Sequence, residues 1–151
     1  MHQSKLMAGA ALVLAMASQA WAEETAADSG KRVLPKLSIN WQCSKDCTIN
    51  DKVPDLLASA YAGAAAKNGF TVSETDVAEV NIVDYRQRPP GARVMMGAFA
   101  GKDRLTVKIR YRGKEVEAGD SVLNALQGMN HLCESVGQRS YKAIAELARR
   151  G

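Results

Sequence analysis

Apolar and polar residues alternate in two parts of this chain, and each alternation predicts a β-strand. Leu37, Ile39 and Trp41 are separated by polar residues, a period of two that indicates a strand with one buried face. The clearest alternation spans residues 104–112, where the apolar positions are Leu105, Val107, Ile109 and Tyr111. We expect shorter strands at residues 70–73, 78–86 and 114–118, the last after a tight hairpin at Gly113.

A period of three to four residues predicts a helix after the first strand. Asn50 and Asp51 are good helix caps, and the Asn68-Gly69 pair is a stop signal. The apolar residues between these signals fall on one helical face: Val53, Leu56, Leu57, Ala60, Tyr61 and Ala64. This spacing is typical of a helix that buries one side against a core.

The C-terminal part carries a second helical stripe. We expect Asp120 and Ser121 to cap it, and apolar residues recur at steps of three and four as far as Leu147. One long helix satisfies this stripe, and so do two helices that break near Gly128 or Gly137.

The order of these elements predicts an α+β fold. A small mixed or antiparallel sheet of about four to five strands, covered on one face by two helices, is the economical packing of this order. The other face of the sheet would then present the polar side of the 104–112 strand to solvent. The small-residue-rich segment between Pro89 and Gly101 is expected to form a long connection.

The N-terminus has the pattern of a cleavable secretory signal peptide at residues 1–22. Lys5 precedes the apolar run Leu6–Ala17, and small residues stand at Ala20 and Ala22. The run is too short to span a bilayer. We therefore expect cleavage after Ala22 and export to the periplasm.

Removal of this peptide would leave a flexible leader at residues 23–33 and a single α+β domain at residues 34–151. No later apolar run reaches membrane-spanning length. A lipid anchor is not expected, because the first cysteine, Cys43, lies far beyond the position that a lipoprotein needs.

The charge balance argues against nucleic acid as a partner. The formal net charge is +4, and it falls to +3 once Lys5 is removed. In an exported protein this mild basic excess favours anionic envelope surfaces. The four Tyr and two Phe of the whole chain offer little surface for base stacking.

Three cysteines can be assigned from their positions. Because an exported protein meets an oxidising compartment, we expect a disulfide between Cys43 and Cys47 that fixes the exit of the first strand. A redox pair is the alternative, although a thioredoxin-type motif has two residues between its cysteines and this turn has three. Cys133 lies on the apolar stripe and is expected to be a buried thiol.

Catalytic chemistry is not indicated. After cleavage His131 is the one histidine left, which excludes sites that need two histidines. Cys133 lies two residues away, and residues two apart on a helix point in different directions. We therefore expect no catalytic site, no cofactor and no enzyme, while a small hydrolase without a recognisable motif stays open.

Soft-metal binding is a second possibility, since thiolates, thioethers and imidazole bind copper. The candidate ligands are Cys43, Cys47, Met95, Met96, Met129 and His131. Their spacing matches no standard site, and methionines in small-residue segments usually serve packing. We therefore expect no metal site.

A row of basic residues follows the outward side of the 104–112 strand: Arg104, Lys108, Arg110 and Arg112, continued by Lys114. Such a row could contact anionic lipids or an acidic partner protein. Alternatively, exposed charges on a strand simply prevent aggregation.

One stretch of the chain resembles a known family. The segment Gly97-Ala98-Phe99-Ala100-Gly101-Lys102 before Leu105-Thr106-Val107, together with Lys67-Asn68-Gly69-Phe70, resembles the domain of unknown function 4410 family of bacterial envelope proteins. The resemblance covers most of residues 35–149. It implies an α+β fold similar to the N-terminal domain of TolB and to CsgG-like curli-export lipoproteins, which serve assembly and partner docking. This chain lacks the lipobox usual in such proteins, and the turn between Cys43 and Cys47 is an addition.

The sequence therefore predicts a non-enzymatic periplasmic domain that binds another envelope component or an anionic envelope surface. The predicted contact regions are the basic strand row and the Pro89–Gly101 segment. A soft-metal (copper) or thiol-linked periplasmic binding protein is the alternative function.

Overall fold

The computed structural model describes residues 32–150, with the exception of residues 45–46, 97–98, 100 and 124–126. The predicted signal peptide and the predicted leader as far as residue 31 lie outside the described residues. Strand β1 (Arg32–Trp41) begins the described chain, several residues ahead of the alternation that starts at Leu37.

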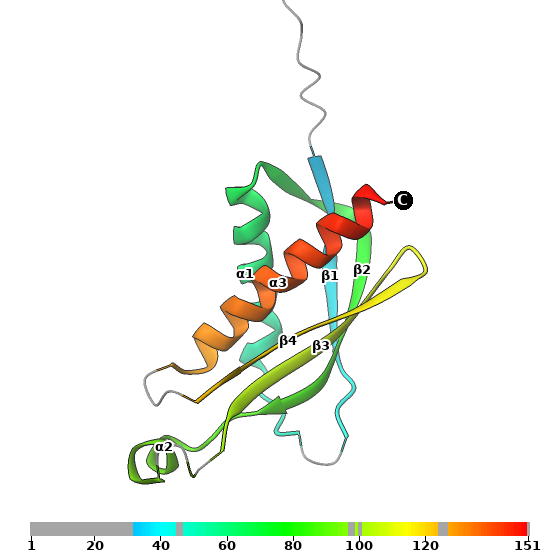
Figure 1. Ribbon diagram of the computed structural model, residues 1–151. Coiled ribbons are helices and arrows are strands. Elements are labelled where there is room, and N and C mark those ends of the chain that lie inside the picture. The colour runs from blue at the N-terminus through cyan, green and yellow to red at the C-terminus, as the bar shows by residue number, and fades with distance from the viewer. Residues whose placement is uncertain (1–31, 45–46, 97–98, 100, 124–126, 151) are drawn as a thin grey trace, which may run out of the picture.

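The described strands form one mixed sheet in the order β1-β2-β3-β4 (Figure 1). β1 pairs in parallel with β2 (Phe70–Arg86). β3 (Asp103–Tyr111) pairs antiparallel with β2 and with β4 (Lys114–Val122). Helix α1 (Lys52–Lys67) connects β1 to β2, and α3 (Met129–Arg149) follows β4. Both helices cover the same face of the sheet, so the predicted α+β fold is confirmed.

The core lies between the helices and this face. On β3 the buried and outward positions alternate as the sequence predicts, with Leu105, Val107 and Ile109 fully buried. On α1 the buried positions are four residues apart: Val53, Leu57, Tyr61 and Ala65. The Tyr61 hydroxyl donates a hydrogen bond of 2.8 Å to the carbonyl of Pro35, which joins α1 to β1.

β2 is one strand, not the two strands that the sequence suggests. Leu34 of β1 pairs with Val72, and Lys36 pairs with Val77, so β2 has extra residues at this point. The Ser73 hydroxyl accepts hydrogen bonds from the backbone N–H groups of Thr75 and Asp76. This polar bulge interrupts the apolar alternation, although the hydrogen-bonded pairing resumes beyond it.

The C-terminal half differs from the sequence prediction in a similar way. Asp120 and Ser121 cap no helix, because β4 continues to Val122 and pairs these residues with Leu105 and Arg104. Helix α3 is a single helix that passes through Gly137 without a break. The predicted connection between β2 and β3 contains a short helix, α2 (Pro90–Met96).

Gly137 is required by close helix packing. A Cβ atom at this position would lie 2.5 Å from the Cβ of Ala60 and 3.1 Å from the backbone of Leu57 and of Tyr61. No side chain fits at such distances, so the glycine lets α3 approach α1. A residue that the sequence suggests as a helix break is therefore a helix-crossing point.

Candidate docking site

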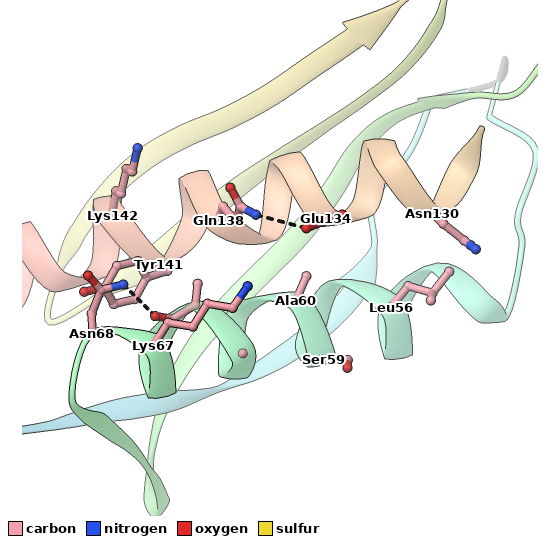
Figure 2. Close-up of a pocket in the computed structure, with 12 residues that line it drawn as sticks. Leu56, Ser59, Ala60, Lys67, Asn68, Asn130, Glu134, Gln138, Tyr141 and Lys142 are labelled. Atoms are coloured by element: carbon pink, nitrogen blue, oxygen red, sulfur yellow. Dashed lines mark hydrogen bonds between the residues drawn. The ribbon is translucent and has the colours of Figure 1, made fainter. Parts of the chain in front are cut away.

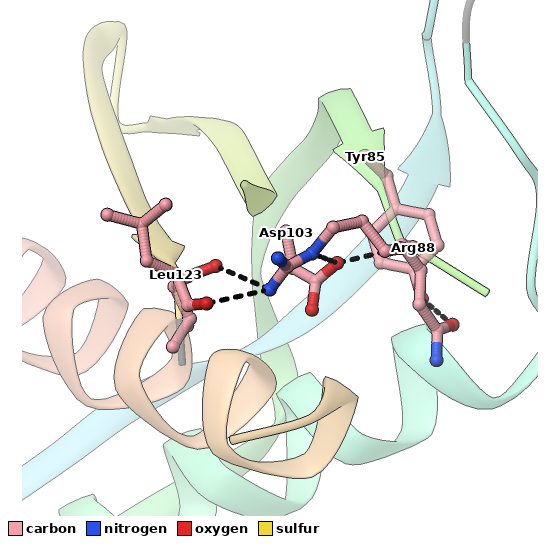
Figure 3. A network of polar contacts seen from close by, with 6 residues as sticks. Tyr85, Arg88, Asp103 and Leu123 are labelled. Atoms are coloured by element: carbon pink, nitrogen blue, oxygen red, sulfur yellow. Dashed lines mark hydrogen bonds and ion pairs between the residues drawn. The ribbon is translucent and has the colours of Figure 1, made fainter. Parts of the chain in front are cut away.

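The connection between β2 and β3 is held by a buried ion pair at its base (Figure 3). The Arg88 Nε atom lies 3.1 Å from Asp103 Oδ1, and both side chains are only 2% exposed. The backbone N–H of Arg88 donates to the same oxygen at 2.6 Å. The Arg88 Nη2 atom also donates to the carbonyls of Val122 and Leu123, at 3.3 and 3.1 Å. These contacts join the chain just after β2 to the start of β3 and to the end of β4.

Beyond this base, the connection exposes large apolar side chains. Met95 is 85% exposed, Met96 is 56% exposed and Phe99 is 95% exposed. We refer to these three residues as the apolar tip. Among the described elements, no other helix or strand packs against α2, which extends away from the helix layer in Figure 1. Scattered exposed apolar residues are normal, whereas large ones close together in the sequence are candidates for an interaction site.

Basic residues flank the apolar tip in the sequence. Arg86 precedes it and Lys102 follows it, and both side chains are exposed. The Arg86 guanidinium lies over Gly101, 3.6 Å from where a Cβ would stand, and the φ of +84° at Gly101 favours glycine. The sequence between Tyr85 and Asp103 contains basic residues but no acidic one. The segment that carries the tip is therefore basic and has no acidic residue of its own.

The predicted basic row lies together on the outer face of β3 and its hairpin, as the alternation requires. Each of its arginines faces a carboxylate. Arg104 pairs with Asp84 at 2.5 Å, and Arg112 lies 4.0 Å from Asp76. Arg110 contacts Glu79 at 3.5 Å and Glu115 at 2.9 Å. Lys108 stands in register with Asn81 on one side and Glu117 on the other.

Cys43 and Cys47 form a disulfide. The backbone N–H of Tyr85 donates a hydrogen bond of 3.1 Å to Cys47 Sγ, so the bridge lies against β2. In this state the pair offers no thiolate to a metal or to a substrate.

The other sulfur candidates lie on helices α2 and α3. Met129 Sδ accepts a hydrogen bond of 3.3 Å from Asn50, while Met95 and Met96 lie on α2. Among the described residues, no group of three or more His, Cys, Asp or Glu side chains could hold a metal ion.

Cys133 is buried in the core, as predicted, at 1% exposure. Burial raises the pKa of its thiol to about 11, which disfavours the thiolate that nucleophilic catalysis needs. His131 is exposed. The two residues therefore do not form a Cys–His pair.

A groove of about 450 Å³ runs between α1 and α3 (Figure 2). Small residues of α1, including Ala60 and Gly63, form its floor, and Glu134 is the one carboxylate that lines it. Gln138 donates a hydrogen bond of 3.2 Å to Glu134 within α3. Ser59, Lys67 and Lys142 also line the groove.

Asp120 joins β4 to α3. Its carboxylate accepts a short hydrogen bond from the Ser135 hydroxyl and lies 3.5 Å from Arg139. The Ser135 hydrogen bond is the main cause that lowers the pKa of Asp120. This contact stabilises the packing of α3 against the sheet.

Comparisons with known proteins are distant. Neither a protein-family model nor a curated protein sequence matches this chain. A PelC dodecamer from Paraburkholderia phytofirmans is 12% identical, with a TM-score of 0.48 over 76% of this chain and 86% of that one. A minor lipoprotein from Acinetobacter baumannii is 13% identical, with a TM-score of 0.36 over 75% and 92% of the two chains. An uncharacterised protein of solved structure is 12% identical, with a TM-score of 0.38 over 79% and 91%.

Within the described residues, no helix is both long and apolar enough to cross a bilayer. The similarities to solved structures assign no function to this chain at these values.

Proposed function

We propose that this chain is a non-enzymatic periplasmic domain that docks onto another component of the bacterial envelope through the apolar tip. The observation that carries the proposal is the exposure of Met95, Met96 and Phe99 on a connection whose base is anchored by a buried ion pair. The periplasmic location rests on the signal-peptide pattern of residues 1–22.

The anchor supports docking for an energetic reason. Binding costs conformational entropy when it orders a loop, and an anchored loop has less to lose. A large aromatic side chain such as Phe99 then contributes much of the binding energy because it buries a large apolar surface.

The basic row of β3 is a weaker candidate for the docking surface. Its arginines already face carboxylates of β2 and β4, so a partner would have to displace existing ion pairs. The arrangement fits the alternative expectation, in which exposed charges keep the sheet face soluble.

The copper-binding alternative is not preferred, because it would need Cys43 and Cys47 as thiolates. They are joined in a disulfide.

The double variant Met95→Ser/Phe99→Ser tests the proposal. We expect the wild-type protein to sediment in part with isolated envelopes from a Gram-negative bacterium, and we expect the variant to lose most of this binding. Ile49→Ser is the matched control, since Ile49 is 64% exposed on a different part of the surface. Each variant should keep the wild-type free energy of unfolding, because these exposed side chains bury little apolar area. Equal sedimentation of wild type and double variant would reject the tip as the docking site.

A further inference from the structure

We infer that the envelope component recognised by the apolar tip is an anionic phospholipid surface, an inference that rests on the proposed docking function. Apolar side chains would enter the interfacial layer, and Arg86 and Lys102, which flank the tip in the sequence, would contact lipid phosphates. The tip would bind at the interface without crossing the bilayer.

The charge of the segment favours this occupant. Arg86 precedes the tip in the sequence and Lys102 follows it, and the Asp103 carboxylate at the base of the connection is buried against Arg88. Each basic residue close to an anionic membrane adds to the attraction. Since no acidic residue stands between Tyr85 and Asp103, nothing within the segment opposes that attraction.

The chemistry of the tip agrees with an interfacial site. Basic residues combined with exposed apolar side chains such as Phe are typical of segments that lie in the headgroup region. The α2 backbone is helical, so its internal hydrogen bonds lower the cost of leaving water.

The exposure of the tip also favours lipid over protein. A protein interface usually depends on a close match of surfaces. Among the described elements, no other helix or strand packs against α2 to shape such a surface around Met95 and Met96. A fluid lipid layer adapts to exposed side chains and needs no such match.

Binding to protein-free vesicles tests the inference. The protein used is the chain from Glu23 onward, which keeps every residue of the core. Vesicles of phosphatidylethanolamine with phosphatidylglycerol are compared with vesicles of phosphatidylcholine alone. We expect binding to the first kind and at least about tenfold less to the second, with a further loss when salt is raised.

Two variants separate the apolar and charged contributions. Met95→Ser/Phe99→Ser should lower vesicle binding by about tenfold or more, because interfacial affinity scales with buried apolar area. Arg86→Gln/Lys102→Gln should lower it by roughly tenfold and remove most of the salt dependence. The control Lys36→Gln/Lys52→Gln removes the same charge from exposed positions elsewhere, and it should retain binding to within about threefold.

The outcomes distinguish the two proposals. Tip-dependent sedimentation with envelopes, combined with no binding to phosphatidylglycerol vesicles, would overturn the lipid inference and indicate a protein partner while the docking function stands. Vesicle binding that the charge control reduces as strongly as Arg86→Gln/Lys102→Gln would also overturn it, since net charge alone would explain the result.

Discussion

The helix layer and the β2–β3 connection are held in place by different interactions. In the helix layer, α3 approaches α1 so closely at Gly137 that no side chain fits between them. The connection has no such packing on α2, and it is fixed at its base by Arg88 and Asp103. The helix layer buries its apolar side chains by close packing. The β2–β3 connection is held by a buried ion pair, and its apolar side chains are exposed to solvent.

This difference bears on function. In a packed layer the buried apolar surface stabilises the fold, so little apolar surface is left to bind a partner. A segment anchored by a buried ion pair keeps its apolar surface available, and the anchor determines where that surface is presented. The comparison predicts that the two regions respond differently to substitution.

Loss of the anchor should have the largest effect. Arg88→Met leaves the Asp103 carboxylate buried without the guanidinium, which should lower the free energy of unfolding by about 3–5 kcal/mol. Urea denaturation measures this change. Arg104→Met is the control, since the exposed Arg104–Asp84 pair should contribute less than about 1 kcal/mol. Equal losses in both variants would contradict the idea that burial distinguishes the base of the connection from the sheet face.

Filling the helix crossing should have an intermediate effect. Gly137→Ala places a Cβ atom against Ala60 and against backbone atoms, and such overpacking should cost about 2 kcal/mol of stability. Gly63→Ala is the control within the helix layer, because a Cβ there meets nothing within 4 Å. It should raise stability by about 0.5–1 kcal/mol through helix propensity. A neutral Gly137→Ala variant would mean that the helices can separate without loss.

The contact between β4 and α3 should have the smallest effect, and it should depend on pH. The pKa of Asp120 is lowered in the folded protein, mainly by Ser135. Its stabilisation is therefore present above about pH 4 and is lost as pH falls through the lowered folded-state pKa. Asp120→Asn should cost about 1 kcal/mol at pH 7 and progressively less in acid.

Asp51→Asn is the charge-matched control, because the Asp51 side chain makes no capping hydrogen bond. Its free energy of unfolding at pH 7 should stay within about 0.5 kcal/mol of the wild-type value. An Asp120→Asn variant that differs from wild type by the same amount at pH 7 and at low pH would contradict the assigned role of the carboxylate.

Local periodicity accounts for the parts of the fold that the sequence predicts. The alternation of Leu105, Val107 and Ile109 places them on one face whatever strands lie beside β3. The helical spacing and the Asn68-Gly69 stop likewise define α1, and Cys43 and Cys47 are close enough in the chain for their disulfide to be expected. Each of these features depends on residues within a few positions of one another.

The candidate site could be predicted only in outline. The sequence indicates a connection at residues 89–101 and a basic row on one strand. It does not indicate that Glu79, Asp84 and Glu115 stand beside the arginines, because the register of β2 and β4 brings them there. The absence of acidic residues between Tyr85 and Asp103, next to Met95, Met96 and Phe99, was the available signal for the tip.

By itself, then, the sequence determined the strand and helix periods, the disulfide pairing and the α+β class, because these follow from short-range spacing. Only the tertiary structure decided that β2 continues through its bulge, that Gly137 is a crossing point and that Arg88 is buried against Asp103. Those features depend on which segments, distant in the sequence, come into contact. These contacts bury the Arg88–Asp103 ion pair, which anchors the connection, whereas the ion pairs on the sheet face stay half exposed and contribute less to stability.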